Sequence, residues 1–139
     1  MVVSATIAVQ SKGFTDILDI TDKVELEVAA SKVRNGVVTV FVKGSTAAVS
    51  TMEYEPGLIA DLQRTLEKLI PSNVPYNHDM RWGDGNGFSH IRATMMGPSL
   101  TIPIQNGRLS LGTWQQVILI DFDNRPRRRE ILLQIVGEL

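Results

Sequence analysis

The sequence contains no cysteine, which excludes cysteine-ligated zinc, thiol catalysis and a disulfide framework. It has no excess of either charge, since 14 Lys and Arg face 15 Asp and Glu for a net charge of -1, and this balance disfavours a polyanion-binding protein. No apolar run approaches the ~20 residues of a membrane span, and Ser4, Thr6 and Gln10 interrupt the N-terminal apolar stretch that a secretory signal would need. We therefore expect a cytoplasmic protein.

The chain has the size and composition of one folded domain. It has 139 residues, of which 43% are hydrophobic and 21% charged, and a chain of this length buries enough surface to fold without a metal or disulfide. We find no internal repeat and no linker. The sequence predicts a single domain over residues 1–139, with an α+β fold of antiparallel sheets and a few helices.

Local patterns predict strands at both ends of the chain and one long helix between them. Leucine and isoleucine recur at three and four residues from Pro56 to Pro71, which indicates an amphipathic helix. Lys23–Ser31 favours a shorter helix ending near Asn35-Gly36, His90–Gly97 has a helical composition, and Asn106-Gly107 is a hairpin signal. The predicted strands are Val2–Gln10, Phe14–Ile20, Val37–Val42, Ala47–Met52, Ser99–Ile104, Thr113–Phe122 and Ile131–Val136.

Trp114 lies within a predicted strand that continues with Val117 and Leu119. An aromatic residue in such a stretch is typically part of a core or an interface. We expect Trp114 to be largely buried, so that Trp114→Ala would cost about 3–5 kcal/mol of stability.

Both histidines of the chain lie in a polar segment, Ser72–Phe88, and just after it. The segment is predicted to be a 17-residue loop, and loops of that length in small domains are usually functional or mobile. Because imidazole and carboxylate are suitable ligands for zinc and similar ions, His78 and His90 with Asp79 and Asp84 form a candidate metal site. The alternative is that each histidine caps a turn or bonds to a backbone carbonyl.

Other polar residues suggest proton transfer or anion binding. Glu53 precedes the long helix, where it is a candidate general base or a further metal ligand, or an ordinary carboxylate at a helix N-terminus. Ser45 and Thr46 follow a strand in a small-residue break that would let backbone N–H groups approach a phosphate, or that forms a tight turn. Arg127 and Arg129 alternate along a strand, where they would clamp a phosphate or protect a sheet edge.

Several short motifs in a fixed order resemble the YjbQ-like family over about Val38–Gly137. They are Ser45-Thr46-Ala47, Glu53, Asp61, Pro71, Tyr76-x-His78-Asp79, Asn86-x-x-x-His90, Gly97-x-Ser99, Gly107-Arg108-Leu109, Leu111-Gly112-Thr113-Trp114-Gln115 and Pro126-Arg127-x-Arg129. The resemblance implies an α+β fold and a homotrimer with a polar, histidine-containing pocket near the subunit contacts. It also implies a weak thiamine-phosphate synthase activity, which is associated with some members.

The sequence departs from this family at one position of interest. Many members have His-Thr-Thr-Ala or a similar motif where this chain has Gly44-Ser45-Thr46-Ala47. Glycine is neither a ligand nor an acid or base, so His78 and His90 remain as the histidines available to a site.

These observations lead to two main functional hypotheses. The first is a thiamine-phosphate synthase-like transferase that acts on a small phosphorylated metabolite, with Glu53, His78 and His90 as catalytic candidates and a divalent ion, Zn or Mg, at His78, His90, Asp79 and Asp84. The second is a trimer that binds a metal or an anion without turnover. RNA binding is the weakest alternative, because no aromatic residues are interleaved with the arginines. The candidate substrate- or anion-binding residues are Ser45, Thr46, Asn86, Thr113, Gln115, Arg127 and Arg129.

Overall fold

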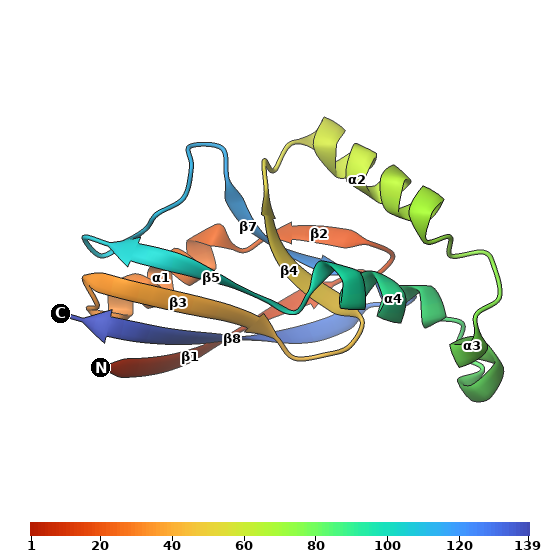
Figure 1. The fold of residues 1–139 in the computed structure, drawn as a ribbon, viewed down its shortest axis with the longest axis horizontal. Coiled ribbons are helices and arrows are strands. Elements are labelled where there is room, and N and C mark those ends of the chain that lie inside the picture. The colour runs from red at the N-terminus through yellow and green to blue at the C-terminus, as the bar shows by residue number, and fades with distance from the viewer.

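The computed structural model covers residues 1–139 and has the α+β fold of antiparallel sheets that the sequence predicts (Figure 1). The larger sheet has the strand order β1-β8-β3-β5-β6 and the smaller one has the order β2-β7-β4. The strands are β1 (Val2–Ser11), β2 (Asp16–Asp19), β3 (Asn35–Val42), β4 (Ala47–Met52), β5 (Ser99–Gln105), β6 (Arg108–Leu109), β7 (Gln116–Asp121) and β8 (Arg127–Glu138). All strand pairs are antiparallel.

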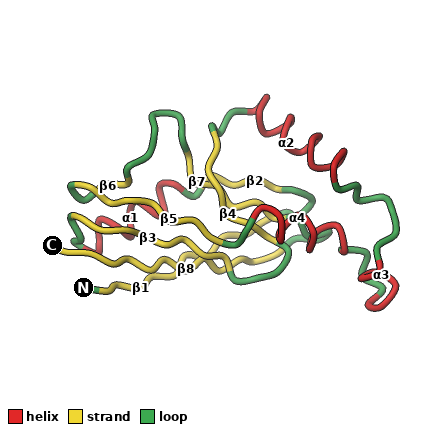
Figure 2. Tube along the Cα trace, viewed as in Figure 1, coloured by secondary structure: helices red, strands yellow, loops and turns green.

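Four helices accompany the sheets: α1 (Thr21–Ser31), α2 (Pro56–Leu69), α3 (Asn77–Trp82) and α4 (Gly87–Met96). Figure 2 shows that α2, α3 and α4 lie toward one end of the molecule, with α3 at its extremity, while α1 lies behind the larger sheet. No helix of the structure is long and apolar enough to cross a membrane.

The smaller sheet is apolar on both faces because it lies between two cores. Val117 and Leu119 of β7 belong to the main core with the larger sheet and α1, whereas Ile118 and Ile120 belong to a second core with α2 and α4. Strands that are covered on both faces have continuous apolar sequences rather than alternating ones. This arrangement explains the uninterrupted Val117–Ile120 run and gives the molecule three layers.

Helix α2 matches its prediction and shows how the sequence sets its start. Pro56 is the first helical residue, and the Glu55 carboxylate accepts hydrogen bonds from the N–H groups of Gly57 and Leu58, both at 2.8 Å. Proline at this position loses no hydrogen bond, because the first N–H groups of a helix have no helical acceptor. Only Leu66 of the helix is fully buried, and Leu69 is 72% exposed.

Two local predictions need correction. The Ser72–Phe88 segment is not a continuous loop, because it contains α3, which Gly83 ends in a left-handed conformation, and α4 begins at Gly87. Helix α1 ends at Ser31, with Lys32 as its left-handed C-terminal residue, rather than near Asn35-Gly36, where β3 already begins.

The prediction for Trp114 is wrong. Its side chain is 72% exposed, because β7 begins only at Gln116 and Trp114 lies on the preceding turn. That turn is closed by two hydrogen bonds between Gly112 and Gln115, each 3.0 Å long. An aromatic side chain so exposed adds little to the stability of one chain, so the large cost expected for Trp114→Ala does not apply to its folding.

Candidate metal and anion site

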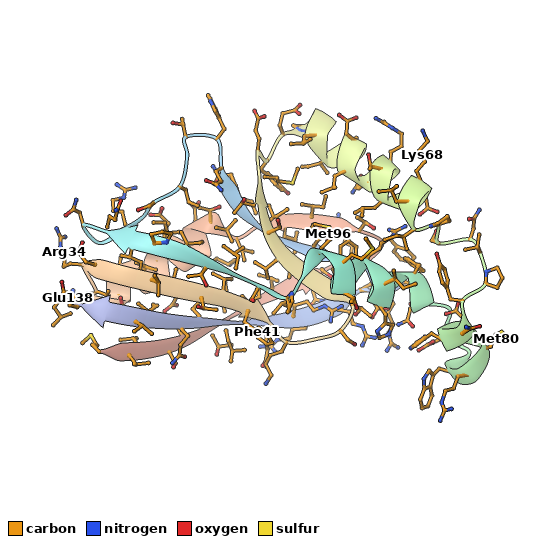
Figure 3. All side chains as sticks on the ribbon, viewed as in Figure 1. Arg34, Phe41, Lys68, Met80, Met96 and Glu138 are labelled. Atoms are coloured by element: carbon orange, nitrogen blue, oxygen red, sulfur yellow. The ribbon has the colours of Figure 1, made fainter.

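The two histidines lie next to each other in the structure. His78 is on α3 and His90 is on α4, and their ring centroids are 4.3 Å apart with the rings tilted by 41°. The two helices pack against each other, although only four residues separate them along the chain. Folding therefore gathers the histidines at the end of the molecule where α3 lies; Met80 marks that end in Figure 3.

Two carboxylates adjoin His78. Its Nδ1 atom lies 3.6 Å from Oδ1 of Asp84 and 3.9 Å from Oδ1 of Asp79. One ligand atom from each of the three residues falls within 4.8 Å of the others. The Nδ1 atom of His78 is buried and has no hydrogen-bond partner in the protein. Burying a polar atom unpaired costs about 1–3 kcal/mol, and a metal ion bound there would remove that cost.

His90 is poised in its neutral form. Burial lowers its pKa from the usual 6.5, and the neighbouring His78 lowers it further, while the carboxylates of Asp123, Asp84 and Asp79 act in the opposite direction. Imidazole binds a metal only when it is neutral. His90 is therefore ready to accept a metal or a proton at neutral pH.

The Asp123 carboxylate links the histidine cluster to the sheets through its hydrogen bonds. Its carboxylate accepts hydrogen bonds from Thr46 Oγ1 at 2.9 Å, Asn86 Nδ2 at 3.3 Å, Arg127 Nε at 3.0 Å and the N–H of Asn124 at 2.8 Å. Burial alone would raise the pKa of this carboxyl group, but the donors together hold it below its usual 3.8. Asp123 is therefore ionised and its charge is compensated by its partners.

Arg129 and Asp121 form a second, more deeply buried ion pair beside Asp123. The Arg129 guanidinium donates from Nε to Oδ2 at 2.7 Å and from Nη2 to Oδ1 at 2.8 Å. Ser11 donates to the same carboxylate at 2.5 Å. The strand alternation predicted for the arginines is present, since Arg129 is buried and Arg128 on the other face is exposed.

The structure thus brings several of the candidate residues to one place. Residues of the predicted metal set cluster on α3, α4 and their connection, and part of the predicted anion set surrounds Asp123. Within that part, Arg127 and Arg129 each hold a carboxylate, so only the guanidinium atoms outside these ion pairs, such as Nη1 of Arg129, remain available to an anion. The members that lie together are His78, His90, Asp79, Asp84, Asn86, Thr46, Arg127 and Arg129, with Ser45 exposed beside Thr46.

Glu53, Thr113 and Gln115 lie elsewhere. Glu53 follows the last residue of β4 while Thr46 precedes the first, and the six residues between these ends span roughly 20 Å at ~3.3 Å per residue. Glu53 lines a different pocket together with Trp114, and Gln115 bonds to Thr51 at 3.1 Å. The geometry therefore does not support the expected partnership of Glu53 with the histidines.

The sequence reading missed the two carboxylates that organise this region, Asp121 and Asp123. They frame Phe122 at the end of the β7 run, where they look like the polar end of a strand. Arg127 and Arg129 offered a signal in the sequence. They follow Asp123 and Asp121 closely after a buried strand, so each arginine has a carboxylate within reach as an ion-pair partner.

Comparison with known proteins gives a consistent family match. The model of the family described as UPF0047 protein YjbQ-like matches residues 5–138. A UPF0047 protein from Archaeoglobus fulgidus is 39% identical over 119 residues, which are 86% of this chain and 90% of that protein. The UPF0047 protein YjbQ of Salmonella typhimurium is 33% identical over 135 residues, covering 96% of this chain and 95% of that protein.

Solved structures of similar proteins have the same fold. A crystal structure from Sulfolobus solfataricus, described as a YbjQ-like protein of unknown function, superposes with a TM-score of 0.94 at 33% identity and 99% coverage of both chains. A protein of the yjbq/upf0047 family from Clostridium acetobutylicum gives a TM-score of 0.87 at 32% identity, covering 95% of this chain and 99% of that one.

Proposed function

The chain belongs to the UPF0047 YjbQ-like family, and from that premise and the site we propose that the protein is a divalent-metal-dependent enzyme acting on a small phosphorylated molecule. The observation that carries the proposal is the buried, unpartnered Nδ1 atom of His78 beside the carboxylates of Asp84 and Asp79. A nitrogen and two oxygens suit zinc, manganese and similar ions. Neutral His90 adjoins them as a further ligand or proton carrier.

The reaction that the family resemblance favours is a thiamine-phosphate synthase-like transfer. In that chemistry a pyrimidine diphosphate loses diphosphate, which departs with the electrons of the broken C–O bond, and the thiazole nitrogen forms the new C–N bond to the remaining carbocation. A bound divalent ion would neutralise charge on the phosphate oxygens. The chain's own task is to hold the diphosphate in a fixed position, and the backbone N–H groups of Ser45 and Thr46 and the exposed Ser45 hydroxyl are available for it. His90 is the candidate to carry a proton.

The second candidate is a protein that binds a metal or an anion without turnover. The same ligands serve it, and the separation of Glu53 from the histidines favours it, because the carboxylates beside the cluster, Asp79 and Asp84, are the candidate metal ligands and leave no further carboxylate for a general base. Turnover assays with candidate phosphorylated substrates separate the two, since only the enzyme releases phosphate or diphosphate.

Metal titration tests the site itself. We expect chelator-treated wild type to bind one equivalent of Zn²⁺ in calorimetry, and His78→Ala to bind at least about 100-fold more weakly, because outer-shell changes alone often cost 10–100-fold. Asp61→Asn, which alters an exposed carboxylate on α2, is the matched control and leaves the affinity unchanged. Since only neutral His90 binds metal, affinity should hold from pH 8 to 7 and fall as the pH drops through its lowered pKa. Equal binding by a folded His78→Ala protein would refute the site.

We also propose a homotrimer. The support is the number of large apolar side chains that one chain leaves exposed, including Trp114 and Leu69 at 72% each and Met80 at 81%. Such side chains are typical of surfaces that another protein covers. We expect light scattering at micromolar concentration to give three times the chain mass of 15.4 kDa. A particle of one chain mass would contradict this proposal.

A further inference from the structure

The segment Gly44–Thr46 lies in the connection from β3 to β4. Backbone hydrogen bonds hold both ends of this connection, while the N–H groups between them have no partner. Lys43 donates its N–H to the carbonyl of Glu130 at 3.1 Å, and the Thr46 carbonyl accepts from the N–H of Phe122 at 2.9 Å. The three N–H groups of Gly44, Ser45 and Thr46 donate to no acceptor in the chain. Runs of free backbone N–H groups are the element from which anion-binding concavities are built.

A buried guanidinium offers one free edge at the same point. Arg129 is 7% exposed, and its Nε and Nη2 atoms are bonded to Asp121 and Thr46. Its Nη1 atom has no such partner, and a Cβ placed on Gly44 would lie 2.7 Å from it. The backbone of Gly44 has a φ of +139°, which favours glycine. Nη1 therefore approaches the surface because residue 44 has no side chain.

A cavity of about 290 Å³ opens at this point, lined by Gly44, Ser45, Ala47, Ala93, Thr94 and Pro98. Ala93 and Thr94 follow His90 by three and four residues on α4, and such residues share one helix face. The Thr94 hydroxyl donates to the carbonyl of His90 at 2.8 Å. The cavity thus lies one helical turn from the histidine cluster.

The polar groups at the cavity favour an anion. No carboxylate lines it, and the two nearest in the network are already occupied: Asp121 by Arg129 and Ser11, and Asp123 by its four donors. The free groups are the backbone N–H donors and the Ser45 hydroxyl, because the hydroxyls of Thr94 and Thr46 already have partners. A phosphate has enough oxygens to accept several donors at once, and guanidinium groups bind phosphates well.

We infer that this cavity is the phosphate subsite of the protein, with Gly44 as the residue that opens it. Phosphate oxygens accept hydrogen bonds from Nη1 of Arg129 and from the N–H groups of Gly44–Thr46, one turn of α4 away from His90. The inference rests on the proposed function in that it places the phosphate of the substrate, but phosphate binding itself needs none of His78, Asp79 or Asp84.

Titration of the purified protein with inorganic phosphate at low ionic strength tests this subsite. Wild type should show saturable binding at one site per chain. In Gly44→Ala the new Cβ forces Nη1 to move, and affinity should fall at least tenfold, about 1.4 kcal/mol. Absence of saturable binding by wild type, or equal binding by Gly44→Ala, overturns the inference.

A second pair of variants keeps the test independent of strain at Gly44. Thr94 is exposed, lines the cavity and makes its side-chain hydrogen bond to the His90 carbonyl rather than to Arg129. The side chains introduced by Thr94→Asp and Thr94→Asn have nearly the same size and differ in charge. Thr94→Asp should therefore bind phosphate at least tenfold more weakly than Thr94→Asn. Equal binding by the two overturns the inference. Loss of Zn²⁺ binding in His78→Ala with phosphate binding intact would separate the metal site from this one.

Discussion

Replacing Asp121 by asparagine is expected to destabilise the protein by about 3–5 kcal/mol, because buried Arg129 loses the carboxylate that it contacts directly and keeps only Asp123, 3.9 Å away. The side chains of Arg129 and Asp121 are 8% and 0% exposed, and two hydrogen bonds of 2.7 and 2.8 Å join them. Water cannot replace the carboxylate at this depth. Asparagine can accept one of the two hydrogen bonds but carries no charge.

Urea unfolding followed by circular dichroism measures this cost. The matched control is Glu130→Gln, which removes a carboxylate that is 45% exposed and lies 3.9 Å from Lys43 and 3.4 Å from Arg128. Exposed ion pairs of this kind contribute about 0–1 kcal/mol. If Asp121→Asn lowers the free energy of unfolding by less than Glu130→Gln does, the buried pair does not stabilise the fold.

Arg92→Met should cost about 2–3 kcal/mol by leaving buried acceptors unpaired. The side chain of Arg92 is 2% exposed. It donates to the carbonyl of Ile70 from Nε at 3.2 Å and from Nη2 at 2.7 Å, and to Thr15 Oγ1 at 2.8 Å. Its guanidinium also lies 4.9 Å from the centre of the Phe88 ring. One side chain thus ties α4 to the end of α2 and to the connection before β2.

The control for this prediction is the partner carboxylate. Glu67 lies 2.8 Å from Nη2 of Arg92 but is 48% exposed, and its pKa is lowered chiefly by the N–H and hydroxyl of Ser72 rather than by Arg92. Glu67→Gln should therefore cost less than about 1 kcal/mol. If thermal melts place Arg92→Met at the same midpoint as Glu67→Gln, the carbonyl of Ile70 has found another donor and the prediction fails.

Much of the fold follows from local patterns. The Leu and Ile spacing from Pro56 to Pro71 predicts α2, and Asn106-Gly107 predicts the β5–β6 turn, where both residues have positive φ. The strands were found because β-branched runs are short and bounded by turn residues. The sequence does not place Trp114 correctly, because an apolar run does not reveal where its strand begins, and that start depends on the pairing of Met52 with Gln116.

The candidate site was less readable from the sequence. The proximity of His78 and His90 could be expected, since one lies within a polar segment and the other just after it, and the four residues between α3 and α4 keep them close. The role of Asp123 could not be expected from the sequence, because it depends on hydrogen-bond donors from three other parts of the chain, among them Thr46 and Asn86. Residue type alone groups Glu53 with the histidines, but it does not report which end of β4 Glu53 occupies.

The position of β8 has a consequence for how the protein is made. β8 is the last element of the chain, yet it lies between β1 and β3, pairing from Val2↔Val136 to Ser11↔Arg127 on one side and with β3 on the other. A ribosome delivers β1 and β3 long before the strand that joins them. The larger sheet therefore closes only once β8 has been made, and until then β1 has no partner strand and β3 can pair only with β5. Such non-local pairing slows folding and prolongs exposure to aggregation.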